Sequence, residues 1–172
     1  MKFYTNINEE NRQAWLKKVI KVLPQGIRIL DAGAGELRNR SLCSHLAYVS
    51  QDFCQYKGNS GGAPNEGLQS KSWDTSRIDL VCDITAIPEP DASFDAILCS
   101  EVLEHIPDPP KALDEFSRLL KPGGKLILTA PFASLVHFAP FHYCSGFSRY
   151  WYEYHLTLRG FEIKELMTVP LL

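Results

Sequence analysis

The sequence lacks an excess of charge of either sign, because 18 lysines and arginines stand against 20 aspartates and glutamates in 172 residues. A chain so close to neutral has no general attraction for phosphate backbones or anionic lipids, so we expect no nucleic-acid partner. It also lacks the polar bias of a disordered chain, since 45% of its residues are hydrophobic. The length suits a single domain over residues 1–172, because domains commonly hold about 100–200 residues.

Long apolar runs and closely spaced cysteine pairs are missing as well. The most apolar stretch, residues 126–141, is interrupted by Pro131, His137 and Pro140, so no membrane-spanning helix is predicted. The first ten residues contain no apolar core, so we expect no signal peptide. Five cysteines form no Cys-x-x-Cys pair, and an odd number cannot all pair within one chain. These features favour a reducing, cytoplasmic compartment.

Strand-like and helix-like patterns alternate along the chain. We expect a helix from residue 9 that ends before Pro24, and further helices over residues 36–45, 109–120 and 148–159. Strands are expected at residues 27–32, 46–50, 78–82, 94–99, 125–129 and 161–167. Residues 54–77 are polar, carry several glycines and have no period, so they predict a long loop. This order indicates an α/β fold with a mostly parallel sheet and helices on both faces.

Ligands of such sheets bind at the carboxyl ends of the strands, so the residues just after each strand matter most. The first strand ends in Asp31-Ala32-Gly33-Ala34-Gly35, whose glycines permit a sharp turn and a close ligand. A dinucleotide site would place a third glycine at position 38, where this chain has arginine. An NAD-dependent oxidoreductase is therefore a disfavoured alternative. Asp31 suits a cationic ligand better than a diphosphate.

The next three strand ends add groups that suit a nucleoside. Asp52 follows the second strand, where a carboxylate can accept both hydroxyls of a ribose. Asp83 and Ile84 follow the third strand and offer an acceptor for an exocyclic amine beside an apolar surface. Ser100 and Glu101 follow the fourth strand. Together, the strand ends predict one nucleoside-bearing ligand.

Six short motifs resemble, in order and spacing, those of class I S-adenosylmethionine-dependent methyltransferases. They are Ile29-Leu30-Asp31-Ala32-Gly33-Ala34-Gly35, Asp52, Asp83-Ile84, Phe94-Asp95, Ser100-Glu101-Val102-Leu103-Glu104-His105-Ile106 and Leu120-Lys121-Pro122-Gly123-Gly124. The resemblance covers roughly residues 27–167. It implies a Rossmann-like three-layer sandwich that moves a methyl group from S-adenosyl-L-methionine to a small-molecule acceptor, leaving S-adenosyl-L-homocysteine. In-line transfer of this kind depends on alignment and needs no covalent enzyme intermediate.

The resemblance also implies roles for residues and regions. The N-terminal helix would occupy residues 1–26, the cofactor-binding core 27–130, and the acceptor-side loop with the last helix and strand 131–172. The glycine turn would lie under the methionine part of the cofactor, Asp52 would bind the ribose, and Asp83 with Ile84 would hold adenine. The full set of cofactor-binding residues implied is Asp31, Ala32, Gly33, Ala34, Gly35, Asp52, Phe53, Asp83, Ile84, Ser100, Glu101 and His105.

The segment after the fifth strand is the candidate acceptor side. Residues 131–143 are aromatic and proline-bearing, and in the resemblance they precede an Arg-Tyr pair. His137, His142 or Tyr143 could face the acceptor, and a histidine there could act as general base for a hydroxyl. The alternative interpretation is that these aromatic residues simply cap the sheet.

Two further expectations concern features that the sequence lacks: a metal site and the seventh strand of the family. Glu101, Glu104 and His105 do not follow the His-Glu-x-x-His pattern, so no metal site is expected. The seventh strand of the family is missing, since the chain stops at Leu172 soon after the sixth predicted strand. An exposed edge of the fifth strand invites pairing, either in a homodimer or with a displaced sixth strand. The alternative function is an incomplete cofactor-binding domain that needs a partner.

Overall fold

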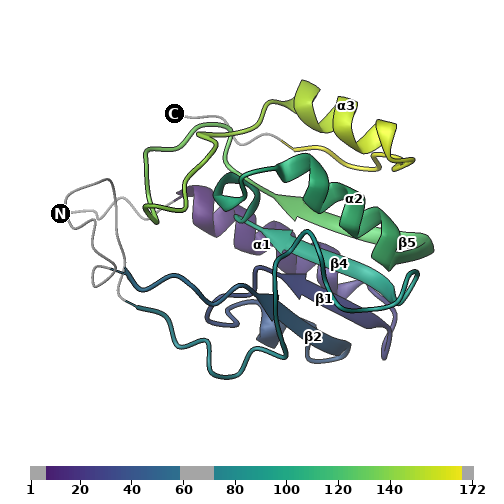
Figure 1. Ribbon diagram of the computed structural model, residues 1–172. Coiled ribbons are helices and arrows are strands. Elements are labelled where there is room, and N and C mark those ends of the chain that lie inside the picture. Colours follow the sequence, from purple (N-terminus) through teal and green to yellow (C-terminus); the bar gives the residue numbers. More distant parts are fainter. Residues whose placement is uncertain (1–6, 59–71, 168–172) are drawn as a thin grey trace.

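The computed structural model describes residues 7–58 and 72–167 of the chain (Figure 1). Within these residues, five strands form one sheet in the order β3-β2-β1-β4-β5, and every neighbouring pair is parallel. The strands are β1 (Arg28–Ala32), β2 (Ala47–Asp52), β3 (Leu80–Val81), β4 (Phe94–Ser100) and β5 (Leu120–Thr129). The predicted mostly parallel, Rossmann-like fold is therefore confirmed. The strand order reverses between β1 and β4, which is where such sheets bind ligands.

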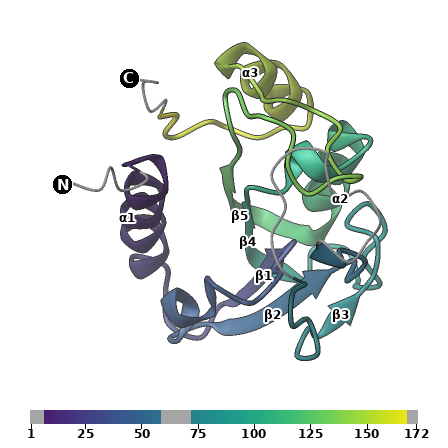
Figure 2. The ribbon, with the colours of Figure 1, turned by 90° about the vertical axis from the view of Figure 1, so that its left-hand side faces the viewer.

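Helices cover both faces of the sheet. Helix α1 (Ile7–Lys21) lies on one side, whereas α2 (Pro109–Leu119) and α3 (Arg149–Leu158) lie on the other (Figure 2). Each side has its own apolar core, with Leu16 and Ile20 of α1 buried on the first and Phe116 of α2 on the second. The sheet and its two helical sides form the three layers that the alternation of elements predicted.

The predicted starts of α2 and α3 are confirmed at their caps. The Asp108 side chain accepts a hydrogen bond from the Lys111 N–H, and the Ser148 hydroxyl accepts one from the Trp151 N–H. Side-chain acceptors of this kind satisfy amide groups that have no partner within the first turn. Gly160 adopts a φ of 78° just beyond α3, a left-handed conformation that ends helices.

The helix predicted over residues 36–45 is wrong. The connection contains turns and one short 3-10 helix, η1 (Arg40–Cys43), because Leu37 has a φ of 61° that interrupts any continuous helix. The third strand contains two residues rather than five. The second strand ends later than predicted, so Asp52 is its last residue and does not follow it.

Strand β5 begins earlier than predicted. The Lys121–Gly124 segment, expected as a turn between helix and strand, lies inside β5, where the register against β4 shifts between Phe94 and Ala96. The extra residues of β5 form a bulge, and Gly123 has the φ of 77° that such a bulge requires.

The strand predicted at residues 161–167 is also wrong, because that segment forms no strand. It contacts α1 instead, since Trp15 Nε1 donates to Glu165 Oε1 over 3.1 Å and Lys18 Nζ lies 3.8 Å from the same atom. Strand β5 is consequently an edge of the described sheet. Residues 59–71 of the predicted long loop lie outside the described residues. No helix among the described residues is long and apolar enough to cross a bilayer.

Candidate functional site

The glycine turn after β1 and the end of β2 are joined by hydrogen bonds. The Gly35 N–H donates to Asp52 Oδ2 over 2.9 Å, and the Cys54 N–H donates to Asp52 Oδ1 over 2.8 Å. The carboxylate is only 4% exposed. Gly33 and Gly35 have φ values of 76° and 50°, in the region that glycine adopts at least cost. The sequence-predicted turn and carboxylate therefore lie in direct contact at the carboxyl edge of the sheet.

Gln51 is a site residue that sequence reasoning missed. Its side-chain oxygen accepts from the Gly33 N–H over 3.1 Å, and its side-chain nitrogen donates to the Cys82 carbonyl over 2.8 Å. Its backbone carbonyl accepts from the Gly33 and Ala34 N–H groups. This buried amide therefore joins the ends of β1, β2 and β3. The sequence signal that could have identified it is a polar residue directly before the carboxylate at the end of a strand.

The ends of β4 and β5 meet at the same edge. Ser100 Oγ and Thr129 Oγ1 lie 2.9 Å apart, and the Glu101 N–H donates to the Thr129 carbonyl over 2.9 Å. Glu101 has a φ of 56°, which is costly for a residue other than glycine and is typical of functional turns. Its carboxylate forms a 3.1 Å ion pair with Arg12 of α1. The structure thus brings Ser100 and Glu101 to the predicted edge.

Asp31 and Asp83 have partners of their own. Asp31 is buried, and its Oδ2 atom accepts a 2.6 Å hydrogen bond from the Tyr48 hydroxyl on β2. Burial raises the pKa of Asp31 to about 6, although the Tyr48 hydrogen bond opposes the shift. Asp83 is exposed and accepts from the backbone N–H and hydroxyl of Thr85, while the neighbouring Ile84 is buried in the core.

Aromatic rings from three segments cover the glycine turn. A β-carbon on Gly35 would lie 2.9 Å from the ring of Trp73, so this ring packs directly on the turn. Trp73, Tyr56 and Phe138 contact one another edge to face, with ring centroids 4.7 to 5.2 Å apart. The predicted cofactor residue Phe53 makes a similar contact with Phe141 at 5.0 Å.

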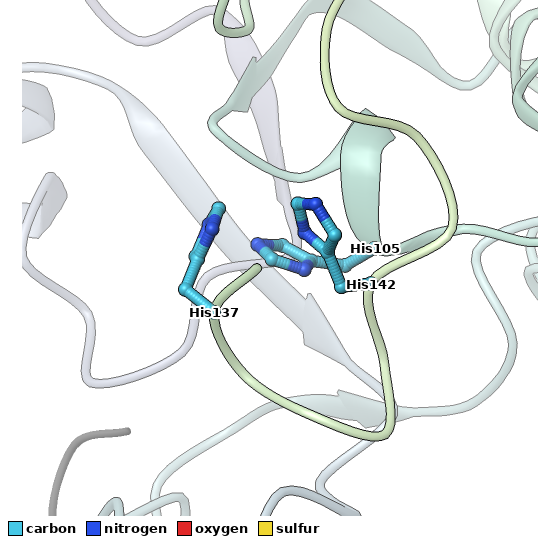
Figure 3. A group of neighbouring side chains, drawn as sticks. All are labelled: His105, His137 and His142. Carbon is cyan, nitrogen blue, oxygen red and sulfur yellow. The ribbon is translucent and has the colours of Figure 1, made fainter. Parts of the chain in front are cut away.

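Three histidines gather together (Figure 3), and two of them, His105 and His137, contact the ring of Phe138. His105 ends the short helix η3 (Leu103–His105) after β4, whereas His137 and His142 lie on the segment that follows β5. Their ring nitrogens lie within 4.8 Å of one another. Tyr143 is half-exposed, and its backbone N–H donates to the Glu104 carbonyl. The structure therefore unites the two acceptor-side histidines with a residue predicted to lie near the cofactor.

Burial alters the charges in this histidine cluster. It lowers the pKa of His105 to about 4 and also lowers that of His142, so both rings are neutral at pH 7. The side chain of Glu104, adjacent to His105, is 1% exposed, and burial raises its pKa to about 8. Among the described residues, Glu104 Oε2, His105 Nε2 and both ring nitrogens of His142 have no hydrogen-bond partner.

Comparison with known proteins places this geometry in a family. A family model described as a methyltransferase domain matches residues 7–166. The chain is 48% identical over 106 residues to a ubiquinone biosynthesis O-methyltransferase of Xanthomonas oryzae pathovar oryzae, an alignment covering 60% of this chain and 43% of that protein. It is 33% identical over 129 residues to a demethylmenaquinone methyltransferase of Clavibacter sepedonicus, covering 72% of this chain and 50% of that protein.

A solved structure shows the same fold. The YcgJ protein from Bacillus subtilis superposes with a TM-score of 0.62 at 20% identity, over 86% of this chain and 68% of that one. The chain itself spans half or less of the length of the two curated relatives. Because the family model covers nearly all of the described residues, the chain belongs to the methyltransferase domain family.

Proposed function

We propose that this chain binds S-adenosylmethionine at the carboxyl ends of β1, β2 and β4 and directs its methyl group to a small-molecule hydroxyl. The observation that carries this proposal is the hydrogen bond between Gly35 and the buried carboxylate of Asp52. It joins the glycine turn after β1, beside the point where the strand order reverses, to a buried carboxylate at the end of β2. Nucleotides bind at the carboxyl ends of the strands near such a point.

The residues present fit the adenosyl group. Each Asp52 oxygen accepts one backbone hydrogen bond, so each keeps a lone pair for one hydroxyl of a ribose. A β-carbon on Gly33 would clash with Val102 and one on Gly35 with the ring of Trp73, so the close turn that the ligand would approach requires glycine at both positions. Asp83 is exposed just beyond the third strand and has a carboxylate that can accept from an exocyclic amine, while the neighbouring Ile84 is buried. When bound, the cofactor supplies an electrophilic methyl group on sulfur.

The acceptor side is the segment that follows β5. His137 and His142 hold neighbouring imidazoles near the glycine turn, and a neutral imidazole can take the proton of an acceptor hydroxyl. Tyr143 and the rings around Phe138 offer flat apolar surfaces. The relative from Xanthomonas oryzae is by its name an O-methyltransferase of ubiquinone biosynthesis, which supports an aromatic ring hydroxyl as the acceptor class.

Calorimetric titration with S-adenosylhomocysteine tests cofactor binding. The unaltered chain should bind one equivalent, and Asp52→Asn should bind at least about tenfold more weakly, because one charge-assisted pair of hydrogen bonds is lost. Asp114→Asn is the matched control, since Asp114 is on α2 and forms its ion pair with Arg159 at the end of α3. Melting curves would show that both variants fold. Absence of binding by the unaltered chain would overturn the proposal.

A second candidate function is a domain that binds the cofactor without transferring its methyl group alone. It is favoured by the position of β5 at an edge of the described sheet, where another chain could pair with it. Incubation with methyl-labelled cofactor and a catechol probe separates the two functions. Labelled product supports the methyltransferase; binding of S-adenosylhomocysteine without any product supports the incomplete domain.

A further inference from the structure

The histidine cluster, His105, His137 and His142, has the composition of a metal site. One ring nitrogen from each residue lies within 4.8 Å of the other two, and the rings converge from two segments of the chain (Figure 3). Three imidazoles are a ligand set typical of Zn²⁺ and of neighbouring transition metals, whereas Mg²⁺ and Ca²⁺ prefer oxygen ligands.

Backbone carbonyls orient two of the three rings. His105 Nδ1 lies 2.6 Å from the Phe141 carbonyl oxygen, and His137 Nδ1 lies 2.8 Å from the Leu135 carbonyl oxygen. Because a carbonyl only accepts, each Nδ1 carries the proton, and the lone pair of a neutral ring is left on Nε2. Histidines that bind metals are held in this way by a hydrogen bond from the other nitrogen.

A buried carboxylate faces the same two nitrogens. Glu104 Oε1 lies 3.6 Å from His105 Nε2 and 3.9 Å from His137 Nε2, and the Glu104 side chain is 1% exposed. These separations are too long for hydrogen bonds, and Glu104 Oε2 has no partner among the described residues. A carboxylate removed from water needs a cation or a donor to compensate it.

We propose that His105, His137 and His142, together with the carboxylate of Glu104, bind one divalent transition-metal ion such as Zn²⁺. An ion in this position gives a partner to His105 Nε2 and to a nitrogen of His142, which otherwise lack one among the described residues, and it compensates the Glu104 carboxylate, whose Oε2 also lacks one. Zn–N bonds of about 2.0–2.1 Å would bring the nitrogens to about 3.4 Å from one another. The loop residues His137 and His142 would make this adjustment of about 1 Å.

The place of the ion also suggests its use, and this part rests on the proposed function. Phe138 contacts both His105, at 5.0 Å between ring centroids, and Trp73, whose ring packs on Gly35. The cluster is therefore connected to the glycine turn through the rings of Phe138 and Trp73, on the proposed acceptor side. With the three histidines bound to the ion, none of them acts as the base. The ion would instead bind the acceptor oxygen as a fifth ligand and lower the pKa of its hydroxyl, so that the proton passes to solvent.

Cobalt provides a spectroscopic probe of the site. The full chain, without a polyhistidine tag and stripped with a chelator, is titrated with Co²⁺ while visible absorption is recorded, and Zn²⁺ is then added as competitor. We expect one equivalent of Co²⁺ with the visible bands of a four- or five-coordinate ion, displaced by Zn²⁺. Absence of these bands overturns the proposal. A strong near-ultraviolet thiolate band also overturns it, because it would identify cysteine ligands.

Variants establish which histidines bind. The double variant His137→Ala, His142→Ala should weaken Co²⁺ binding by about 100-fold or more, since loss of a residue that only hydrogen-bonds to a metal ligand already costs about 10–100-fold. Glu104→Gln keeps the shape of the side chain and should weaken binding about tenfold. His155→Ala is the matched control, because His155 lies on α3 beside Trp151. Unchanged binding in the double variant, with circular dichroism confirming the fold, contradicts the proposal.

Titration of the same samples with S-adenosylhomocysteine separates the two proposals. Metal binding without cofactor binding overturns the proposed function and leaves the metal site intact. Cofactor binding without metal binding overturns the metal site alone.

Discussion

Gly33 and Val102 are packed so closely that a β-carbon on the glycine would lie 2.5 Å from Val102 Cγ2. Gly33 belongs to the turn after β1, and Val102 lies just beyond the end of β4. The contact therefore joins the two strands between which the strand order reverses, and it leaves no room for any side chain at position 33.

Replacement of Gly33 by alanine should destabilise the domain by about 2–4 kcal/mol. About 1–2 kcal/mol comes from its φ of 76° and the remainder from the clash with Val102. Gly160→Ala is the matched control, because Gly160 has a φ of 78° but open space around it. Urea unfolding measures both. A Gly33→Ala, Val102→Ala double variant should recover part of the loss; equal costs for the two glycine variants would contradict the clash.

Stability should fall as the pH rises from about 4 to about 6, because of Asp31. Its pKa is raised from 3.8 to about 6 by burial, so the folded state binds a proton that the unfolded state has released. The stabilising effect is complete below pH 4 and is lost as the pH passes 6. Asp31→Asn should remove this contribution, which amounts to at most about 3 kcal/mol.

The measurement for Asp31 is the free energy of unfolding of both proteins between pH 4 and pH 7. The difference between them should grow in favour of Asp31→Asn as the pH rises. The amide oxygen of asparagine can still accept from the Tyr48 hydroxyl, so the variant keeps that hydrogen bond. Parallel pH profiles would show that Asp31 titrates as it does in the unfolded chain.

Two carboxylates that share Arg118 should differ in their effect on stability. Glu115 is buried and also accepts from the Ile87 N–H over 2.7 Å, so Glu115→Ala should cost about 2–3 kcal/mol. Asp91 is 79% exposed, so Asp91→Ala should cost less than about 1 kcal/mol. Thermal unfolding ranks the two variants. A greater loss of stability in Asp91→Ala than in Glu115→Ala would mean that burial does not determine how much each ion pair with Arg118 contributes.

Trp73 should report cofactor binding by its fluorescence. Its ring packs on Gly35, where the cofactor is proposed to lie, so S-adenosylhomocysteine should change its emission. Trp73→Phe should abolish most of the change. Trp151→Phe should preserve it, because Trp151 is on α3 and packs against Phe147 and His155. A change that survives in Trp73→Phe would place the ligand elsewhere.

Local chemistry made some elements predictable from the sequence. Asp108 and Ser148 mark helix starts because their side chains can accept from the first turn, and the structure shows both bonds. The apolar run of β4 indicates a strand covered on both faces, and five of its residues are buried. At the site, Asp52 and the glycine turn were predicted from their places at strand ends.

Elements that depend on distant contacts were not predictable in this way. Residues 161–167 carry alternating apolar side chains, but a strand needs a neighbour, and Glu165 instead contacts Trp15 and Lys18 of α1. Leu37 turns left-handed although its sequence favours a helix. The meeting of His105 with His137 and His142 depends on how the segment after β5 folds back, which has no local signal.

The most direct test of the account is a crystal structure of the chain with S-adenosylhomocysteine bound. Both Asp52 oxygens should lie about 3 Å from the ribose hydroxyls, with the amino-acid end of the ligand at Gly33 and Gly35. A ligand bound away from Asp52, or a ribose whose hydroxyls contact other residues only, would contradict it.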